Sequence, residues 1–159
     1  MSARGQHGNA PLDLDFDIVV EAELPAGLDL DWLRRLARFA LEQEGASGAW
    51  AVAVALVDDS RLQDLHREFM AVDEPTDVMT FPSDEPGAGG GDIAVSVERA
   101  AEQGPAFGHS AAEETDFLVV HGLLHLCGWD DPTPEDRAAM LTRQAEIIAL
   151  FQQRELRRD

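Results

Sequence analysis

The chain has 159 residues, of which 31 are acidic and 12 are basic, so its formal net charge at pH 7 is −19. The length fits one domain. Its apolar runs are far shorter than the roughly 18 residues that would indicate a membrane span, so we expect a soluble protein. A surface this acidic repels polyanions, and a nucleic-acid partner would therefore need a local patch of arginines, because the sequence contains no lysine.

The first residues are polar and lack the apolar stretch of a secretory signal. We expect residues 1–14 to form a disordered tail and residues 15–155 to form the domain. The single cysteine, Cys127, cannot form an internal disulfide, which agrees with a reducing compartment. These features predict a cytoplasmic protein.

Apolar periodicity predicts two strand and helix pairs in the first half of the chain. Residues 15–24 alternate as a strand, and residues 28–45 follow as an amphipathic helix. The valine-rich run at residues 49–59 predicts the second strand, and a short helix is expected over residues 60–70.

Two more strands are predicted at residues 76–81 and 91–97. They are joined by PSDEPGAGGG, residues 82–91, which has no apolar residue larger than alanine apart from its prolines. We expect this segment to be a flexible loop that buries little. The Lys-Ser/Thr that would follow a phosphate-binding loop is missing.

Helices dominate the C-terminal part. A short helix is expected at residues 96–103, and a capping box opens a mostly apolar and therefore buried helix at residues 111–127. Gly128 stands where a left-handed cap would end that helix, and Thr133 with Pro134 opens the last one. The order β-α-β-α-β-β-α-α-α indicates a single α+β domain with an approximately four-stranded mixed sheet and about five helices.

The sequence HGLLHLCGWDD, residues 121–131, contains the strongest chemical signal. His121 and His125 are four residues apart on a helix, so both imidazoles can reach one metal ion, although two ordinary hydrogen-bonded histidines would show the same spacing. A turn after the helix would bring Asp130 or Asp131 within reach. Two histidines and one carboxylate leave an open coordination position, which is typical of a catalytic metal.

Common zinc peptidases need a glutamate directly after the first histidine, and this chain has Gly122 there. Glu114 shares the helix face of His121 but lies about two turns away, too far for direct proton transfer, so any role would be indirect or on the substrate side. His109 precedes the helix cap, and a loop or capping role is favoured over metal binding.

The segment HGLLHLCGWDD, residues 121–131, resembles the signature HGxLHLxGYDH of the YbeY family of rRNA maturation endoribonucleases. DEPTDVMTFP at residues 73–82 is similar to that family's D-x-P-T-D-V-L-S-F-P motif, and GDIAVS at residues 91–96 is similar to its G-D-I-x-I-S motif. The three motifs occur in the same order, and the resemblance spans about residues 16–151.

The resemblance implies a small α+β fold with the metal-binding helix packed on a four-stranded sheet. It also implies a metal-dependent, single-strand-specific endoribonuclease that acts in 16S rRNA processing and ribosome quality control. The family's metal is of the zinc type, held by three histidines. His121 and His125 match the first two, and Asp131 stands at the third, so these three residues are the expected Zn²⁺ ligands and catalytic residues.

The implied partners are single-stranded rRNA or pre-rRNA and the small ribosomal subunit with its assembly factors, without a membrane or DNA partner. The arginine common in the family before the D-x-P-T-D motif is replaced by Met70. His66, Arg67, Thr76 and Asp77 are weaker candidates for substrate binding, and each could instead be an ordinary surface or strand-start residue.

Two other functions stay open from the sequence. The first is a metallopeptidase-like hydrolase, because helical HxxxH sites also serve that chemistry. The second is a non-catalytic ribosome-assembly factor whose metal is structural or absent, which the acidic composition and the lost third histidine would favour.

Overall fold

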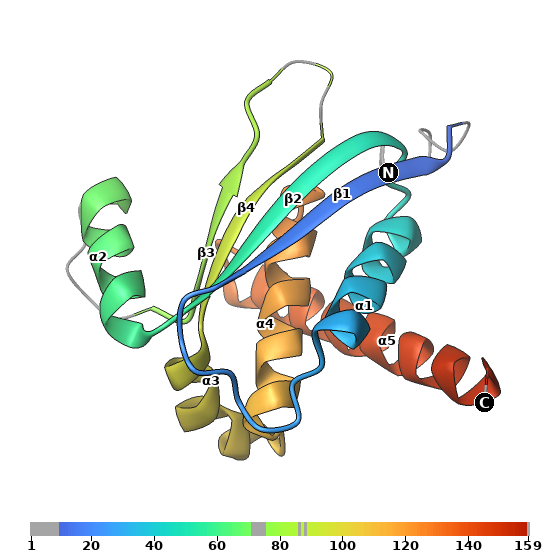
Figure 1. The fold of residues 1–159 in the computed structure, drawn as a ribbon. Coiled ribbons are helices and arrows are strands. Elements are labelled where there is room, and N and C mark those ends of the chain that lie inside the picture. Colours follow the sequence, from blue (N-terminus) through green and yellow to red (C-terminus); the bar gives the residue numbers. More distant parts are fainter. Residues whose placement is uncertain (1–9, 71–75, 86, 88, 159) are drawn as a thin grey trace.

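Four strands form one sheet in the computed structural model, which describes residues 10–70, 76–85, 87 and 89–158 (Figure 1). The strands stand in the order β1-β2-β4-β3. β1 pairs parallel with β2, β2 pairs parallel with β4, and β3 pairs antiparallel with β4. Their bounds are Leu12–Val20 for β1, Gly48–Val57 for β2, Val78–Pro82 for β3 and Gly89–Ser96 for β4.

Five α-helices and one short 3-10 helix accompany the sheet within the described residues. They are α1 (Leu30–Gln43), α2 (Asp59–Met70), α3 (Val97–Gln103), η2 (Gly104–Phe107), α4 (Ala111–Leu126) and α5 (Pro134–Arg158). The α+β class, the single domain and the mixed four-stranded sheet predicted from the sequence are confirmed. None of the helices in the described part of the chain is long and apolar enough to cross a membrane.

The main core lies between the sheet and the layer formed by α1, α4 and α5 (Figure 1). Side chains alternate between the two faces of a strand. On β4, Ile93 and Val95 face the main core, whereas Ala94 faces a smaller cluster with Leu62 of α2 and Met79 of β3. Helix α4 is therefore packed on one face of the sheet, and α2 covers part of the other.

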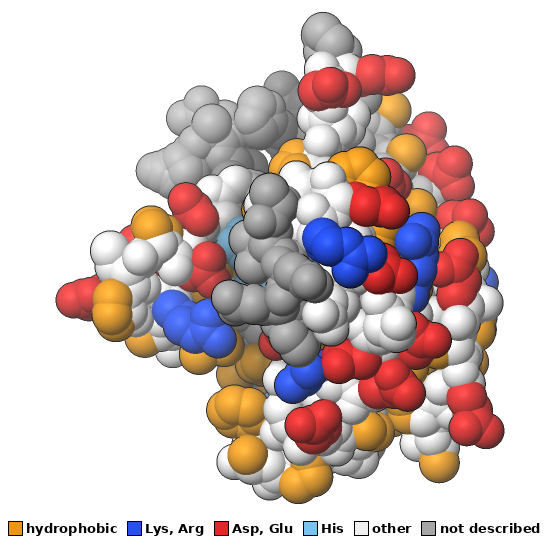
Figure 2. Space-filling view, turned by 90° about the vertical axis from the view of Figure 1, so that its left-hand side faces the viewer, with side chains coloured by type: hydrophobic (Ala, Val, Ile, Leu, Met, Phe, Trp, Pro, Cys, Tyr) orange, Lys and Arg blue, Asp and Glu red, His pale blue; other side chains and the backbone are white. Residues whose placement is uncertain are grey.

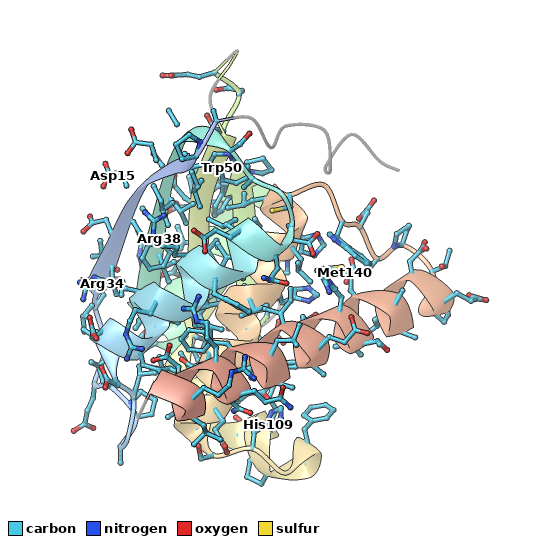
Figure 3. All side chains as sticks on the ribbon, turned by 90° about the vertical axis from the view of Figure 1, so that its right-hand side faces the viewer. Asp15, Arg34, Arg38, Trp50, His109 and Met140 are labelled. Carbon is cyan, nitrogen blue, oxygen red and sulfur yellow. The ribbon has the colours of Figure 1, made fainter. Side chains whose placement is uncertain are left out.

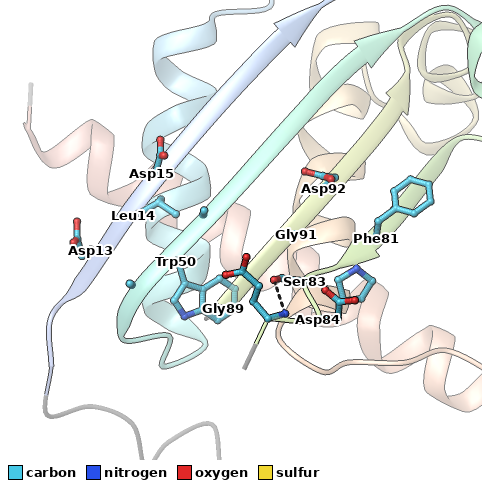
Figure 4. Close-up of a pocket in the computed structure, with 14 residues that line it drawn as sticks. Asp13, Leu14, Asp15, Trp50, Phe81, Ser83, Asp84, Gly89, Gly91 and Asp92 are labelled. Atoms are coloured by element: carbon cyan, nitrogen blue, oxygen red, sulfur yellow. Dashed lines mark hydrogen bonds between the residues drawn. The ribbon is translucent and has the colours of Figure 1, made fainter. Parts of the chain in front are cut away.

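The prediction of a flexible loop over residues 82–91 is wrong at both ends, because Pro82 still belongs to β3 and β4 begins at Gly89, two residues before the strand predicted at 91–97. Gly89, Gly90 and Gly91 belong to β4 and pair with β2 from Trp50 to Val52. Gly90 is buried with φ +114°, and a Cβ atom there would lie 2.0 Å from the carbonyl oxygen of Ala51. At Gly89, the indole ring of Trp50 occupies the space that a Cβ atom would need (Figure 4). Glycine is required here because β4 approaches β2 closely. The glycine-rich composition therefore reflects close packing of two strands and not a flexible loop.

The N-terminal boundary also differs from the prediction. β1 starts at Leu12, inside the segment expected to be a tail, and it ends at Val20 instead of residue 24. The alternation of leucine and aspartate from Leu12 onward was already a strand signal, because Asp13, Asp15 and Asp17 are exposed while the apolar residues between them are partly buried. Figure 3 shows Asp15 pointing away from the helical layer. Residues 1–9 of the predicted tail lie outside the described residues.

Candidate metal centre

Helix α4 carries His121 and His125 on one face, one turn apart. Their Nε2 atoms lie 3.1 Å from each other. Zinc binds imidazole nitrogen at about 2.0–2.1 Å, so neighbouring nitrogens around a tetrahedral ion are a little over 3 Å apart. The two side chains therefore already have the separation that one shared metal ion requires.

Each imidazole is oriented by a hydrogen bond at its other nitrogen. Nδ1 of His121 lies 2.8 Å from Oε1 of Gln144, which is fully buried, and Nδ1 of His125 lies 3.0 Å from the carbonyl oxygen of Trp129. The amide nitrogen of Gln144 donates to the carbonyl of Phe117, which fixes the amide so that Oε1 faces the histidine. Both partners accept, so both Nδ1 atoms carry the proton and both Nε2 lone pairs are available to a cation.

The protonation state of His121 also suits a metal ligand. Burial lowers the pKa of His121 below its ordinary value, and the nearby His125 lowers it further, while the hydrogen bond to Gln144 and the charge of Asp131 act in the opposite direction. The neutral imidazole is thus favoured near pH 7. Neutral imidazole is the form that binds metal.

The chain reverses directly after α4. Gly128 has φ +104°, its N–H donates to the carbonyl of His125, and the N–H of Trp129 donates to the carbonyl of Leu124. This pair of bonds is a Schellman motif, which confirms Gly128 as the left-handed cap. The indole N–H of Trp129 donates to Glu44, the C-cap residue of α1, at 2.7 Å and anchors the turn.

The turn brings Asp131 back to the histidines. Its carboxylate oxygens lie 3.7 Å from Nε2 of His121 and 3.8 Å from Nε2 of His125. One ligand atom from each of these three residues lies within 4.8 Å of the others, so the cluster could hold a metal ion. Asp130 is exposed, and its side chain accepts from the backbone N–H of Asp131. Of the two carboxylates in range, the structure therefore brings Asp131 to the site.

A cleft of about 410 Å³ lies in front of these three side chains. His66 from α2 and Thr76 and Asp77 from the segment before β3, the weaker candidates for substrate binding, line it. Arg67 does not line it, because its guanidinium is turned to Asp64 at 2.8 Å. Met70 also contributes to the wall, at the position where the family pattern has an arginine.

Arg137 lines the cleft and was missed by the sequence reasoning. Its guanidinium lies 3.8 Å from the carboxylate of Asp131, and its side chain is 63% exposed. It belongs to the first turns of α5, which begins at Pro134 and is capped by Thr133 as predicted. The only available signal was its position six residues after Asp131, which does not by itself indicate that an arginine faces the site.

Gly122 shows why this helix does not carry a peptidase base. It is buried against β4, and a Cβ atom there would lie 2.8 Å from a methyl carbon of Ile93. A glutamate at this position would point into the core and not into the cleft. The position that supplies the general base in the common HExxH site is thus closed by packing.

The face that carries the cleft has charged side chains of both signs. Figure 2 views the molecule from the side that carries α2, and acidic side chains are spread over this face with arginines in separate patches. Arg137 is the one arginine among the described residues that line the cleft. Attraction of a polyanion to this site would therefore depend on very few positive charges.

Together, the fold and the cleft define a small α+β enzyme with a site that could hold one metal ion. A family model described as Endoribonuclease YbeY matches residues 22–152. The chain belongs to this YbeY family of endoribonucleases, and the resemblance stated from the three motifs is confirmed.

Relatives and a solved structure agree with this membership. An Endoribonuclease YbeY of Symbiobacterium thermophilum is 42% identical over 130 residues, which covers 74% of this chain and 83% of the relative. One of Moorella thermoacetica is 40% identical over 142 residues, covering 81% and 91%. A Thermotoga maritima protein of known solution structure has a TM-score of 0.54 at 25% identity, covering 86% of this chain and 93% of that chain.

Proposed function

We propose that this protein is a metal-dependent endoribonuclease that cleaves single-stranded RNA. The observation that carries the proposal is the convergence of His121, His125 and Asp131 on one point at the floor of an open cleft. We propose Zn²⁺ as the metal because two neutral imidazoles and one carboxylate are a donor set that zinc enzymes use, with a further position left open. Family membership supports RNA as the substrate.

The residues present fit such an ion. With the protons on Nδ1, both Nε2 atoms can bind the ion, Asp131 supplies the negative charge, and Gln144 with the Trp129 carbonyl holds the imidazoles in place. When bound, the ion would polarise a phosphoryl oxygen and make a water molecule a better nucleophile.

The chain's own residues supply the rest of the site. Arg137 would bind a phosphate oxygen of the substrate, because its guanidinium is exposed at the cleft. The carboxylate of Asp77 would orient the attacking water and accept its proton, since it is the second carboxylate that lines the cleft besides Asp131. Thr76 and His66 would contact the ribose or base of the nucleotide on the wall formed by α2 and the start of β3.

The size of the cleft favours an unpaired strand. Ligand pockets of about 300–1,000 Å³ hold one small molecule, and a cleft of about 410 Å³ has room for a single nucleotide unit. A single strand can turn its phosphate toward the floor of the cleft, whereas a rigid duplex cannot enter. We further propose that the substrate is rRNA or its precursor, cleaved in the cytoplasm during 16S rRNA maturation or ribosome quality control.

The test is cleavage of a labelled single-stranded RNA, with the duplex of the same sequence and an unstructured protein as alternative substrates. We expect cleavage of the single strand only, and none by His121→Ala at equal concentration. Cleavage of the protein substrate would support the metallopeptidase alternative. If no substrate is cleaved while the protein binds the small ribosomal subunit, the non-catalytic assembly factor would be the better description.

A further inference from the structure

Behind the wall of the cleft, polar side chains form a hydrogen-bonded chain that ends on Asp77. The amide nitrogen of Gln103 donates to Oδ2 of Asp77 at 3.1 Å and to Oε2 of Glu114 at 2.8 Å. Nδ1 of His109 lies 2.7 Å from the other carboxylate oxygen of Glu114. The chain joins the segment before β3, the end of α3 and the start of α4.

Glu114 is the buried centre of this chain. Its side chain is 3% exposed, whereas that of His109 is 29% exposed. A carboxylate with so little access to water needs a hydrogen-bond donor at each oxygen, because burial without donors is costly. His109 and Gln103 meet one oxygen each. His109 therefore does more than the predicted loop or capping role, because it also binds Glu114. Glu114 in turn holds Gln103, which is an indirect role of the kind considered from the sequence.

Gln103 has no freedom to turn without losing a bond. Its amide nitrogen carries two hydrogens, which allows one donated bond to each of the two carboxylates, at 3.1 Å and 2.8 Å. The backbone next to Gln103 and the backbone of Asp77 are also held by hydrogen bonds. The N–H of His109 donates to the carbonyl of Gly104, and the N–H of Ser96 donates to the carbonyl of Asp77. Without the amide, the carboxylates of Asp77 and Glu114 would face each other with no donor between them and would repel.

We propose that Gln103 is a positioning residue for the cleavage reaction, which holds the carboxylate of Asp77 in the cleft beside the candidate metal centre. This inference rests on the proposed function, because it assigns Gln103 an effect on catalysis through Asp77. Gln103 touches neither the cleft nor the three candidate ligands among the contacts of the described residues. Its effect must therefore be on the rate of cleavage and not on metal affinity.

The experiment compares Gln103→Ala and Gln103→Glu with the wild type and with Gln153→Ala, an exposed glutamine of α5. We expect kcat for single-stranded RNA to fall about 10- to 100-fold in both Gln103 variants, since displacing a catalytic group by about 1 Å has effects of this size. Gln103→Glu keeps the shape, and its ionised form cannot donate, so measurements above neutral pH separate the hydrogen bond from the volume. The Zn²⁺ affinity of Gln103→Ala should match that of the control, whereas its melting temperature should fall, because buried Glu114 loses one of its two donors.

A double-mutant cycle tests whether Gln103 acts through Asp77. Gln103→Ala should change kcat by less than about twofold in an Asp77→Ala background, because the group that it positions is absent. Equal losses in both backgrounds, or a wild-type kcat in Gln103→Glu, would overturn the proposal.

Crystal structures keep the inference testable if the wild type does not cleave RNA, an outcome that contradicts the proposed function itself. In Gln103→Ala the carboxylate of Asp77 should leave the position that it has in a wild-type crystal. If it stays, Gln103 does not position it, whatever the protein's activity is.

Discussion

Gln144 and His121 form the buried contact that orients the first candidate ligand. The two residues are joined by a 2.8 Å hydrogen bond between Oε1 and Nδ1, and Gln144 has no exposed surface. A glutamine this deep in an otherwise apolar helix interface is costly unless its amide is satisfied. It is satisfied here by the histidine and by the carbonyl of Phe117. The contact therefore belongs to the site as much as to the core.

Replacing Gln144 should weaken metal binding, although none of the three candidate ligands is changed. We expect Gln144→Leu to lower Zn²⁺ affinity about 10- to 100-fold, which is the usual effect of removing a hydrogen-bond partner of a ligating histidine. The leucine is close in volume, so folding should be preserved. Competition with a chromophoric chelator measures the affinity, with Gln153→Leu as the surface control. Unchanged affinity would mean that His121 is oriented by packing alone.

Asp131 should be the third ligand. We expect Asp131→Ala to lose most of the metal affinity, and Asp131→His to keep or increase it, because imidazole is also a good zinc ligand. Removing a negative charge makes the site more cationic and the activated water more acidic, so Asp131→His should shift cleavage to lower pH. Asp130→Ala is the matched control, since Asp130 is exposed and only supports the turn. Loss of metal in the control but not in Asp131→Ala would reverse the assignment.

Arg137 should carry much of the contact with phosphate. Arg137→Ala should raise KM for single-stranded RNA about tenfold, and should reduce the slope of log affinity against log salt concentration by about 0.7, the value for one phosphate contact on a single strand. The exposed Arg61 at the start of α2 does not line the cleft, and Arg61→Ala provides the control for general charge. A salt dependence that is identical in the Arg137 variant and the wild type would exclude this contact.

Asp116 should make the protein less stable as the pH rises. Burial raises the pKa of Asp116 from 3.8 to about 7, and the charges of Glu113 and Asp29 act in the same direction. The folded state therefore holds a proton that the unfolded state has released. Its stabilising effect is complete below about pH 4 and is lost as the pH rises through about 7.

Asp116→Asn should remove this dependence and raise the free energy of unfolding at pH 8 by about 1–3 kcal/mol. Urea unfolding of both proteins at pH 5 and pH 8 measures the effect. Asp15→Asn, on the exposed face of β1, serves as the control. Parallel pH profiles for the wild type and Asp116→Asn would show that the carboxyl group is not desolvated in solution.

Local patterns were sufficient to predict the helix of the metal centre and its end. The spacing of His121 and His125 and the glycine at position 128 determine their geometry within a few residues along the chain, so the sequence carries that information directly. The loop predicted for Gly89 and Gly90 is wrong, because flexible loops and closely packed strands both select glycine. Composition alone does not distinguish the two.

Tertiary contacts account for what the sequence could not provide. Gln144 lies 23 residues from His121, and Gln103 lies 26 residues from Asp77. The residues next to each glutamine in the sequence do not indicate that its side chain makes these contacts. Their roles depend on how α5 and α3 pack against α4, and no periodicity within a single helix reports that packing.

The most direct test of the account is metal titration of the stripped enzyme. Protein purified without a histidine tag is treated with a chelator, and Zn²⁺ is then added in fractions of one equivalent while single-stranded RNA cleavage is followed. We predict no cleavage before addition, a linear rise to one ion per chain and a plateau beyond it, with no rise in His121→Ala. Full cleavage by the stripped protein would contradict a metal-dependent site at His121, His125 and Asp131.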